Sequence, residues 1–380
     1  MNNIQIKKLI LPVLFIAMIT VISAMSFYGQ KQVYSENEKR RLAEFPELSW
    51  ESIKSGEFQS GLENYISDHL FGRDFFVGVD AYVNLALGKN SLNDIYKADD
   101  GYLVNSPGNQ TSEKNLKNFE KNIKVMETFS IFNGIKATAI IIPSSGYIMQ
   151  DKLPAFHMDY NDKKLLEKAS KSAPSVKFID AQSSLTKAYK AGKQVYYKTD
   201  HHITSEGSYA IYDEYCKVSG FDCPTKEQYK ITKYDDFYGS TYSGSGYWLN
   251  DADTMEVWDL GEDVTVTLDY DDIHNTMFFD KHLKSKDKYP LYLDGNHGVV
   301  RIDNPNATGG TLLVVRDSFA QNFVPFLTHN YKTIHMVDMR YFRNSLDSVL
   351  GGVKPDEVLY IYGIDTLLDD GESLPWLLMN

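Results

Sequence analysis

Short apolar runs separated by helical segments constrain the fold of this chain more than any other feature. Residues 137–142 read Ala-Thr-Ala-Ile-Ile-Ile, and residues 312–315 read Leu-Leu-Val-Val. Continuous runs of this kind, rich in β-branched residues, are typical of strands buried on both faces of a parallel sheet. Further strands are predicted at 176–179, 194–197, 333–337 and 357–362, and helices at 113–132, 182–191, 205–218, 319–327 and 346–350. This alternation predicts an α/β fold, a three-layer sandwich with a mostly parallel sheet.

The alternation is interrupted between about residues 226 and 308. This segment is rich in Tyr, Asp, Gly, Ser and Thr and contains strand-like pieces such as 264–268, so we interpret it as a partly β insertion. Ahead of the sandwich, two helices are predicted between residues 50 and 87 and a hairpin at 95–104. The expected organisation is a membrane anchor (1–30), a juxtamembrane linker with helices (31–94) and a single domain (95–380) that contains the insertion.

An uncharged apolar run extends from Leu9 to Tyr28, directly after Lys7 and Lys8. Its length is about the 20 residues that a helix needs to cross a membrane, so we interpret it as a single-pass anchor. The alternative is a signal peptide cleaved near residues 22–24 (Ile-Ser-Ala), which would leave a secreted protein. In both cases the lysines stay on the cytoplasmic side, so the body of the chain is expected to be extracytoplasmic.

Composition limits the partners and cofactors of the chain. The 39 Lys and Arg residues against 51 Asp and Glu give a net charge of −12, and no dense basic tract follows the apolar run. Because nucleic-acid binding requires concentrated positive charge, no nucleic-acid partner is expected. The two cysteines, Cys216 and Cys223, flank the end of a predicted helix; a disulfide and a pair of free thiols are both consistent with export. No Cys/His array has zinc-site spacing, so neither a metal nor another cofactor is expected.

Asp200, His201 and His202 lie where the predicted strand 194–197 gives way to the helix 205–218. Side chains at such a junction line the crevice at the carboxyl edge of a parallel sheet. We predict that the Asp200 carboxylate orients the His202 imidazole, which acts as a base. The alternative is a capped turn whose imidazoles are solvated. Neighbouring side chains of an extended segment alternate, so His201 is assigned to packing or support, with a role as the base as its alternative.

Ser318 follows the strand 312–315 and begins a predicted helix. Its hydroxyl is therefore expected at the sheet edge, beside N–H groups of the first helical turn, which could serve as part of an oxyanion site. A plain helix cap is the alternative. Because both motifs end strands assigned to one sheet, we predict that Ser318 attacks an acyl carbon, His202 accepts its proton and Asp200 holds the imidazole.

These motifs resemble the DHHW protein family, which is related to the SGNH-hydrolase-like domains of alginate O-acetylation proteins. The resemblance rests on Thr-Asp-His-His-Ile-Thr-Ser-Glu-Gly at 199–207 and on Arg-Asp-Ser-Phe-Ala-Gln-Asn-Phe-Val-Pro-Phe-Leu at 316–327, and it covers the chain from about residue 71 to its end. It implies a membrane-anchored extracytoplasmic domain with a permuted SGNH-hydrolase-like fold, in which Asp-x-His precedes the serine.

Carried over position by position, the resemblance assigns the catalytic roles to Asp200, His202 and Ser318. Two residues depart from the related patterns. Ile203 stands where the family has tryptophan, and its aliphatic side chain can fill that volume. Arg316 stands where ordinary SGNH enzymes have glycine, which leaves the oxyanion geometry open.

Three further residues are candidates for the oxyanion site or for substrate binding. Gly239 and Ser240 could donate backbone N–H groups, because glycine allows close backbone approach; an ordinary tight turn is the alternative. Arg340 follows a predicted strand at the same edge and could orient a carbonyl or an acidic sugar, with an ion pair to Asp338 as the alternative. Aromatic residues of the insertion form a sugar platform or cover its core: Tyr242, Tyr247 and Trp248.

The leading hypothesis is an O-acetyltransferase that acts on hydroxyls of a secreted or cell-wall polysaccharide through an acyl-serine. The resemblance implies a multi-pass membrane acyltransferase as the partner that delivers the acetyl group. A polysaccharide O-acetylesterase would use the same triad, and a non-catalytic glycan-binding component would keep only the fold. A metal-dependent phosphoesterase that uses Asp-His-His would need further aspartates at strand ends, but Asp251 and Asp253 lie in the turn-rich insertion, and an exported, acidic body disfavours its usual substrates.

Overall fold

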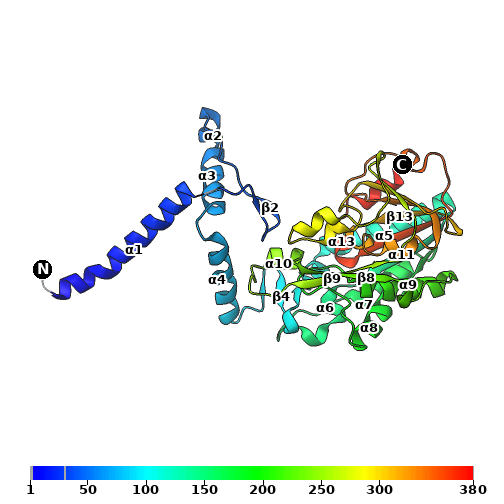
Figure 1. The fold of residues 1–380 in the computed structure, drawn as a ribbon, viewed down its shortest axis with the longest axis horizontal. Coiled ribbons are helices and arrows are strands. Elements are labelled where there is room, and N and C mark those ends of the chain that lie inside the picture. The colour runs from blue at the N-terminus through cyan, green and yellow to red at the C-terminus, as the bar shows by residue number, and fades with distance from the viewer. Residues whose placement is uncertain (1–2, 30, 380) are drawn as a thin grey trace. The chain divides into compact units, whose positions relative to one another are not determined.

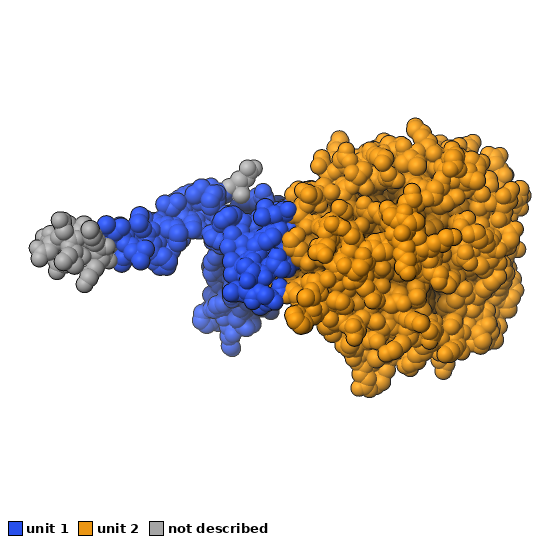
Figure 2. Space-filling view, turned by 90° about the horizontal axis from the view of Figure 1, so that it is seen from below, with its two compact units in different colours: residues 1–89, 246–249 blue, residues 90–245, 250–380 orange. Residues whose placement is uncertain are grey.

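The computed structural model describes residues 3–29 and 31–379 and separates the chain into two compact units. The N-terminal unit comprises Met1–Lys89 together with the short segment Gly246–Leu249, and the α/β unit comprises Asn90–Ser245 and Asn250–Asn380 (Figure 2). The chain therefore leaves the α/β unit and returns to it within the predicted insertion.

The N-terminal unit is helical (Figure 1). Its helices are α1 (Asn3–Tyr28), α2 (Trp50–Ser55), α3 (Glu57–Asp68) and α4 (Arg73–Ala86), and the two-residue strands β1 (Tyr34–Ser35) and β2 (Arg40–Arg41) pair with each other. By length and composition, the part of α1 from Ile10 to Tyr28 can cross a membrane. The ion pairs Arg40–Asp68 and Arg73–Glu38 tie the linker to α3 and α4. Where two helices were predicted between residues 50 and 87, the structure has three, because Gly56 separates α2 from α3.

An eight-stranded sheet forms the centre of the α/β unit, in the order β11-β10-β12-β14-β13-β15-β6-β7. Five of its strands run parallel: β6 (Lys136–Ile142), β7 (Val176–Phe178), β13 (Gly309–Arg316), β14 (Tyr331–Val337) and β15 (Glu357–Gly363). Val315 of β13 pairs with Val337 on one side and with Tyr360 on the other. The carboxyl ends of β13, β14, β15 and β6 consequently meet at one edge of the sheet.

Three strands of the segment 226–308 extend this sheet in antiparallel fashion: β10 (Thr265–Leu268), β11 (Asp272–His274) and β12 (Val299–Asp303). A separate ribbon consists of β8 (Lys230–Phe237) and β9 (Asp253–Asp259), and a small sheet of β3 (Ser91–Leu92), β4 (Ile95–Lys97) and β5 (Leu103–Asn105). The segment is therefore partly β, as predicted, and part of it completes the main sheet.

Helices cover both faces of the sheet. One face packs against α5 (Glu113–Asn133), α7 (Asp162–Ser172), α13 (Ile364–Asp369) and the 3₁₀ helix η8 (Leu374–Leu378). The other packs against α6 (Ser145–Ile148), α8 (Ala181–Lys190), α9 (Ser205–Ser219) and α11 (Val324–Leu327). Consecutive residues of β13 alternate between the two cores, with Val314 in one and Val315 in the other. The predicted three-layer α/β sandwich with a mostly parallel sheet is confirmed.

Two predicted elements differ from the structure. Residues 194–197 do not join the sheet; Tyr196 forms an isolated antiparallel bridge with Ile203, and Thr204 N donates to Val195 O at 3.0 Å. The apolar run is buried because the chain folds back on itself as a tight loop. The helix predicted at 319–327 is a 3₁₀ turn, η7 (Ser318–Ala320), followed by α11, whose Pro325 lacks the N–H that a continuous helix would need.

The remaining short helices lie in connections between these elements. They are α10 (Ser240–Ser245), α12 (Asp347–Leu350), η1 (Asp99–Gly101), η2 (Pro107–Thr111), η3 (Gln150–Lys152), η4 (Lys226–Gln228), η5 (Asp280–Lys284) and η6 (Tyr289–Leu291). Cys216 and Cys223 are joined by a disulfide after α9, which decides between the two alternatives that the sequence left open.

Candidate active site

The loop that carries Asp200 and His202 is held in place by a buried carboxylate. Asp253, at the start of β9, accepts hydrogen bonds from the N–H groups of Lys198 at 2.9 Å and Thr199 at 2.7 Å, and from the Thr199 hydroxyl at 2.6 Å. Burial raises the pKa of Asp253. Its oxygens bind the loop, so the structure does not place this residue as a metal ligand of the kind that a phosphoesterase requires.

Ser318 is presented by a turn at the carboxyl end of β13. Asp317 is fully buried, and its carboxylate accepts from Phe319 N at 2.9 Å and from Gly363 N at 2.8 Å. These bonds cap η7 and fix the turn against the end of β15. Burial raises the pKa of the Asp317 carboxyl. The sequence analysis had no separate role for Asp317, although an Asp before a serine is a common helix cap.

Asp200, His202 and Ser318 form a continuous hydrogen-bonded chain. His202 Nε2 lies 2.8 Å from Ser318 Oγ, and His202 Nδ1 lies 2.5 Å from Asp200 Oδ1. The side chains of Asp200 and His202 are almost completely shielded from solvent. The structure thus brings together the three residues that the sequence singled out, although 116 positions separate His202 from Ser318. The distances are those of a nucleophile, a base and an orienting carboxylate.

Two N–H groups also fix the orientation of Asp200. Its Oδ1 accepts from His202 N at 2.9 Å, and its Oδ2 accepts from Ser240 N at 2.6 Å. A Cβ atom on Gly239 would lie 2.0 Å from the Asp200 Cβ, so only glycine fits at position 239 without moving the carboxylate. Gly239 N in turn donates to Thr199 Oγ1 at 3.2 Å.

The N–H groups of Gly239 and Ser240, predicted as oxyanion donors, are bonded to the loop that carries Asp200. The substrate-binding role of Arg340 stays a prediction. Its guanidinium makes two bonds to Asp338, from Nε at 2.9 Å and from Nη2 at 2.7 Å, which is the ion pair named as the alternative. Arg316 stands where ordinary SGNH enzymes have glycine. It is buried without contact to solvent and lies 3.5 Å from the Asp338 carboxylate.

Tyr289 is a contact of the site that the sequence analysis missed. Its ring stacks on that of His202 with centroids 3.8 Å apart and planes 8° from parallel, and its hydroxyl donates to Ser318 O at 3.0 Å. Burial raises the pKa of Tyr289 well above its usual value, so the phenol stays neutral. This tyrosine belongs to η6 within the insertion, where no sequence motif predicts a functional residue.

His201 bonds to a different serine, Ser240. Its Nδ1 lies 2.6 Å from Ser240 Oγ, and its ring packs 3.8 Å from that of His202. The structure thus places His202 in the position of the base and His201 beside it. Ile203 is fully buried, which agrees with an aliphatic side chain filling the volume of the family's tryptophan.

Asp200, His201 and His202 each offer a ligand atom within 4.8 Å of the others, so they are the group that could hold a metal ion among the residues that the structure describes. Their atoms are already engaged with one another and with hydroxyl groups. A serine on the base and a carboxylate on its other nitrogen are the arrangement of a proton relay. The site therefore suits nucleophilic chemistry.

The aromatic residues proposed as a sugar platform are instead packed into the protein. Tyr242 and Tyr247 are buried, and Tyr247 makes an edge contact with Tyr82 of α4 at 5.8 Å. Trp248 lies against Gly78 of the same helix. Tyr247 and Trp248 thus pack within the N-terminal unit, and not on a core of the insertion's own.

Comparisons with known proteins agree with this fold. A family model described as DHHW protein matches residues 140–337. A DHHW family protein from Eubacterium siraeum is 20% identical, with a TM-score of 0.65 over 76% of this chain and 96% of the other. Bacillus cereus PatB1 with a sulfonyl adduct is 19% identical, with a TM-score of 0.60 over 73% and 96%. The O-acetyltransferase domain of Pseudomonas putida AlgJ is 10% identical, with a TM-score of 0.48 over 73% and 93%. No curated protein matches the chain.

Proposed function

The chain belongs to the DHHW protein family, and we propose that it is an extracytoplasmic O-acetyltransferase that uses Ser318 as its nucleophile. The observation that carries the proposal is the hydrogen-bonded chain from Ser318 through His202 to Asp200. The acceptor we propose is a hydroxyl group of a secreted or cell-wall polysaccharide.

In the first half-reaction, Ser318 Oγ attacks the carbonyl carbon of an acetyl donor while His202 Nε2 takes the hydroxyl proton. Asp200 accepts the Nδ1–H of the same ring, which keeps Nε2 free to act as the base and stabilises the imidazolium. His202 then protonates the leaving group, and the acetyl group remains on Ser318 as an ester. In the second half-reaction, His202 takes the proton of the acceptor hydroxyl, whose oxygen attacks this ester. The proton returns to Ser318 Oγ as the acetylated acceptor leaves.

The surroundings of the imidazole support this sequence of steps. Tyr289 covers one face of the His202 ring, and Phe319 contacts it edge-on at 4.9 Å, so the ring has little freedom to turn away from Ser318. Electrostatic interactions in such a shielded place are stronger than in water. The N–H of Ser318 begins η7, and the first N–H groups of a helix have no acceptor within it. It is our candidate for stabilising the oxyanion.

The N-terminal helix supports the cellular placement that we propose. The part of α1 from Ile10 to Tyr28 is apolar and long enough to cross a membrane, and Lys7 and Lys8, just before this part, favour retention of the N-terminus in the cytoplasm. The α/β unit would then lie outside the cytoplasm, beyond the reach of cytoplasmic acetyl donors. We therefore propose a multi-pass membrane acyltransferase as the partner that delivers the acetyl group.

The test is to incubate the purified full-length chain in detergent with p-nitrophenyl acetate, with and without an acceptor polysaccharide. The proposal expects acetylated polysaccharide, with a matching decrease of free acetate, and loss of both in Ser318→Ala. Ser170→Ala, an exposed serine of α7, is the matched control and should behave as wild type.

The other outcomes separate the alternatives. Acetate release that is unaffected by the acceptor and lost in Ser318→Ala would identify an acetylesterase with the same residues. Absence of any turnover, with polysaccharide binding that survives substitution of Asp200, His202 and Ser318, would identify a non-catalytic binding protein. Undiminished turnover in Ser318→Ala would overturn the mechanism.

A further inference from the structure

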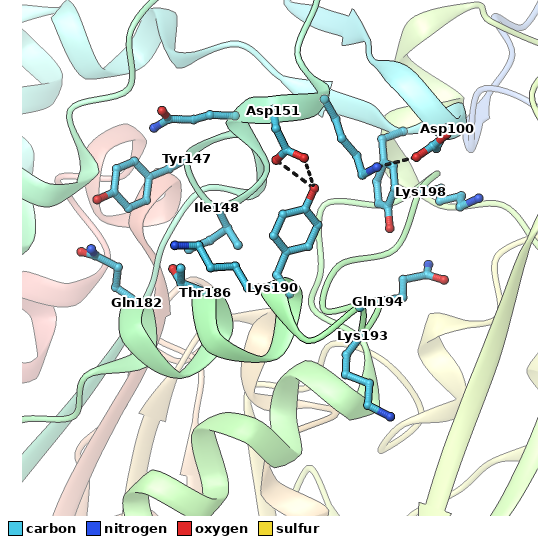
Figure 3. Close-up of a pocket in the computed structure, with 15 residues that line it drawn as sticks. Asp100, Tyr147, Ile148, Asp151, Gln182, Thr186, Lys190, Lys193, Gln194 and Lys198 are labelled. Carbon is cyan, nitrogen blue, oxygen red and sulfur yellow. Dashed lines mark hydrogen bonds and ion pairs between the residues drawn. The ribbon is translucent and has the colours of Figure 1, made fainter.

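A large groove on the α/β unit is not used by the catalytic residues. Its volume is about 1080 Å³, slightly above the roughly 300–1,000 Å³ that is usual for small-molecule sites. Its walls come from four segments, which are the turn η1, the segment 147–152 with η3, the helix α8 and the loop 192–198 (Figure 3). The groove is open to solvent, so a bound chain molecule can extend beyond it.

Positive charge gathers in this groove although the whole chain has a net charge of −12. Four lysines and two aspartates line it, which leaves an excess of two positive charges. Both aspartates already have partners, since Asp100 pairs with Lys152 and Asp151 accepts the Tyr189 hydroxyl at 2.9 and 2.8 Å. The negative charge in the groove is therefore largely engaged within the protein.

The other lysines are available to a ligand. Lys190 and Lys193 are exposed and form no salt bridge within the described part of the chain; Lys193 acts on Glu256 only through longer-range attraction. Lys198 lies over the Tyr102 ring at 5.7 Å from its centroid. Three ammonium groups along one groove make a site for a ligand that carries repeated negative charge.

The rest of the lining suits sugars. Gln182, Thr186 and Lys190 follow one another at intervals of four on α8, so they present one polar stripe to the groove, as Figure 3 shows. Tyr147 and Tyr189 are half-buried and offer aromatic surface beside this stripe. Aromatic faces pack against the apolar faces of sugar rings, and amides and hydroxyls bond to their hydroxyl groups.

Two of the segments that line the groove continue in the chain toward residues of the candidate active site. Lys198 precedes Asp200 by two residues, so their Cα atoms are at most about 7.6 Å apart. On the opposite wall, Tyr147 lies two residues after Ser145, and Ser145 lines a small cavity together with His201 and Phe319, the neighbour of Ser318. A chain bound in the groove therefore lies beside the loop of the proposed base.

We propose that this groove, which we call the lysine groove, binds an anionic polysaccharide and brings one of its hydroxyl groups to Ser318. The inference deepens the proposed function and rests on it for the role of acceptor. Carboxylate and phosphate groups on the sugar chain share the chemistry that lysines recognise, so the proposal concerns negatively charged glycans of either kind.

The experiment measures binding of three probes to the full-length chain in detergent by isothermal titration calorimetry. They are hexagalacturonate, which carries carboxylates, a glycerol phosphate oligomer, which carries phosphates, and neutral maltohexaose. We expect at least one anionic probe to bind about tenfold more tightly than maltohexaose, with an affinity that falls as salt is added. Whichever anionic probe binds more tightly identifies the charged group.

The decisive variant is the double charge reversal Lys190→Glu with Lys193→Glu. Its matched control is Lys163→Glu with Lys164→Glu, which changes the net charge equally on the exposed side of α7. We expect the groove variant to weaken the binding of the anionic probe by about tenfold and the control to leave it within about twofold. Equal affinity for neutral and anionic probes, or equal effects of both variants, would overturn the proposal.

Turnover of p-nitrophenyl acetate keeps the two proposals apart. This small ester reports the chemistry at Ser318 without an acceptor, and the control variant Lys163→Glu with Lys164→Glu should hydrolyse it at the wild-type rate. Anionic binding without any Ser318-dependent turnover would leave the lysine groove as a glycan site and refute the proposed chemistry. Turnover that depends on Ser318, together with binding that does not depend on the groove, would support the proposed chemistry and refute the lysine groove.

Discussion

Gly239→Ala tests how strictly the carboxylate of the relay must be placed. The added Cβ would lie 2.0 Å from the Asp200 Cβ and 2.3 Å from its Oδ2. Carbon atoms in contact are about 3.5–4.0 Å apart, so the two groups must separate by about 1.5 Å. Asp200 Oδ1 now lies 2.5 Å from His202 Nδ1, and a shift of this size away from the ring would break that bond.

The expected decrease in kcat depends on how far the Asp200 carboxylate is displaced from His202. A misplacement of about 1 Å can reduce an enzyme's rate by about 100-fold, and loss of the orienting carboxylate in a serine triad reduces it by about 10,000-fold. We therefore expect Gly239→Ala to lower kcat for p-nitrophenyl acetate between these two limits. At about 1.4 kcal/mol for each factor of ten, this corresponds to about 2.7–5.4 kcal/mol of transition-state stabilisation.

The assay pairs turnover with thermal unfolding of the same preparations, because a buried clash also lowers stability. Gly108→Ala is the matched control, since its Cβ would meet no atom nearer than 3.9 Å. It should retain both the activity and the melting temperature of the wild type. A folded Gly239→Ala protein with kcat within about threefold of wild type would refute the requirement for a fixed Asp200.

Three further predictions concern the site and the stability of the fold. Tyr289→Phe keeps the ring on His202 but removes the bond to the Ser318 carbonyl oxygen, so kcat should fall by less than about tenfold; steady-state kinetics that show a larger loss would give the hydroxyl a direct part in the reaction. Burial raises the pKa of Asp365 to about 7, and its unperturbed value is 3.8. The folded protein therefore keeps a proton that the unfolded chain releases, and the free energy of unfolding should fall as pH rises from about 4 to about 7, by up to about 1.4 kcal/mol per unit. Urea denaturation across this range should show a smaller slope in Asp365→Asn, and an unchanged slope would contradict the assignment. Replacing Cys216 and Cys223 with serine opens a loop of seven-residue separation and should lower the free energy of unfolding by about 2 kcal/mol; equal stability of the two proteins would count against the disulfide.

Local patterns in the sequence were sufficient for the parts of the fold that are locally determined. The run at 137–142 is β6, and the run at 312–315 lies within β13, because continuous apolar residues can be buried on both faces only inside a covered sheet. Ser318 could be singled out for the same reason. It follows the end of such a strand, where a parallel sheet exposes its carboxyl edge.

Longer-range contacts were not visible in the sequence. The residues 194–197 are as apolar as a strand, and no local signal shows that Tyr196 pairs with Ile203 of its own loop. Asp200 therefore reaches Ser318 from a loop, whereas the sequence predicted that it follows a strand of the main sheet. Asp253 and Tyr289 act from the insertion, in which β9 and η6 are positioned by packing between segments far apart in the chain.

For Gly239, Ser240 and Arg340, the structure adds hydrogen-bond partners that the sequence does not show. Ser240 does lie at the site, but its N–H is committed to Asp200. Arg340 has a carboxylate two residues away, and the bidentate bond to Asp338 satisfies its guanidinium. Hydrogen-bond partners decide such roles, and a sequence shows only that donors and acceptors are present.

The most direct test of the central claim is mass spectrometry of the full-length chain after brief incubation with p-nitrophenyl acetate at low temperature. The account predicts a mass increase of one acetyl group, located on the peptide that contains Ser318 and released by an acceptor polysaccharide or by hydroxylamine. Ser318→Ala should not gain it, and His202→Ala should gain it far more slowly. An acetyl group that accumulates elsewhere while Ser318 stays unmodified, during undiminished turnover, would contradict the acyl-serine mechanism.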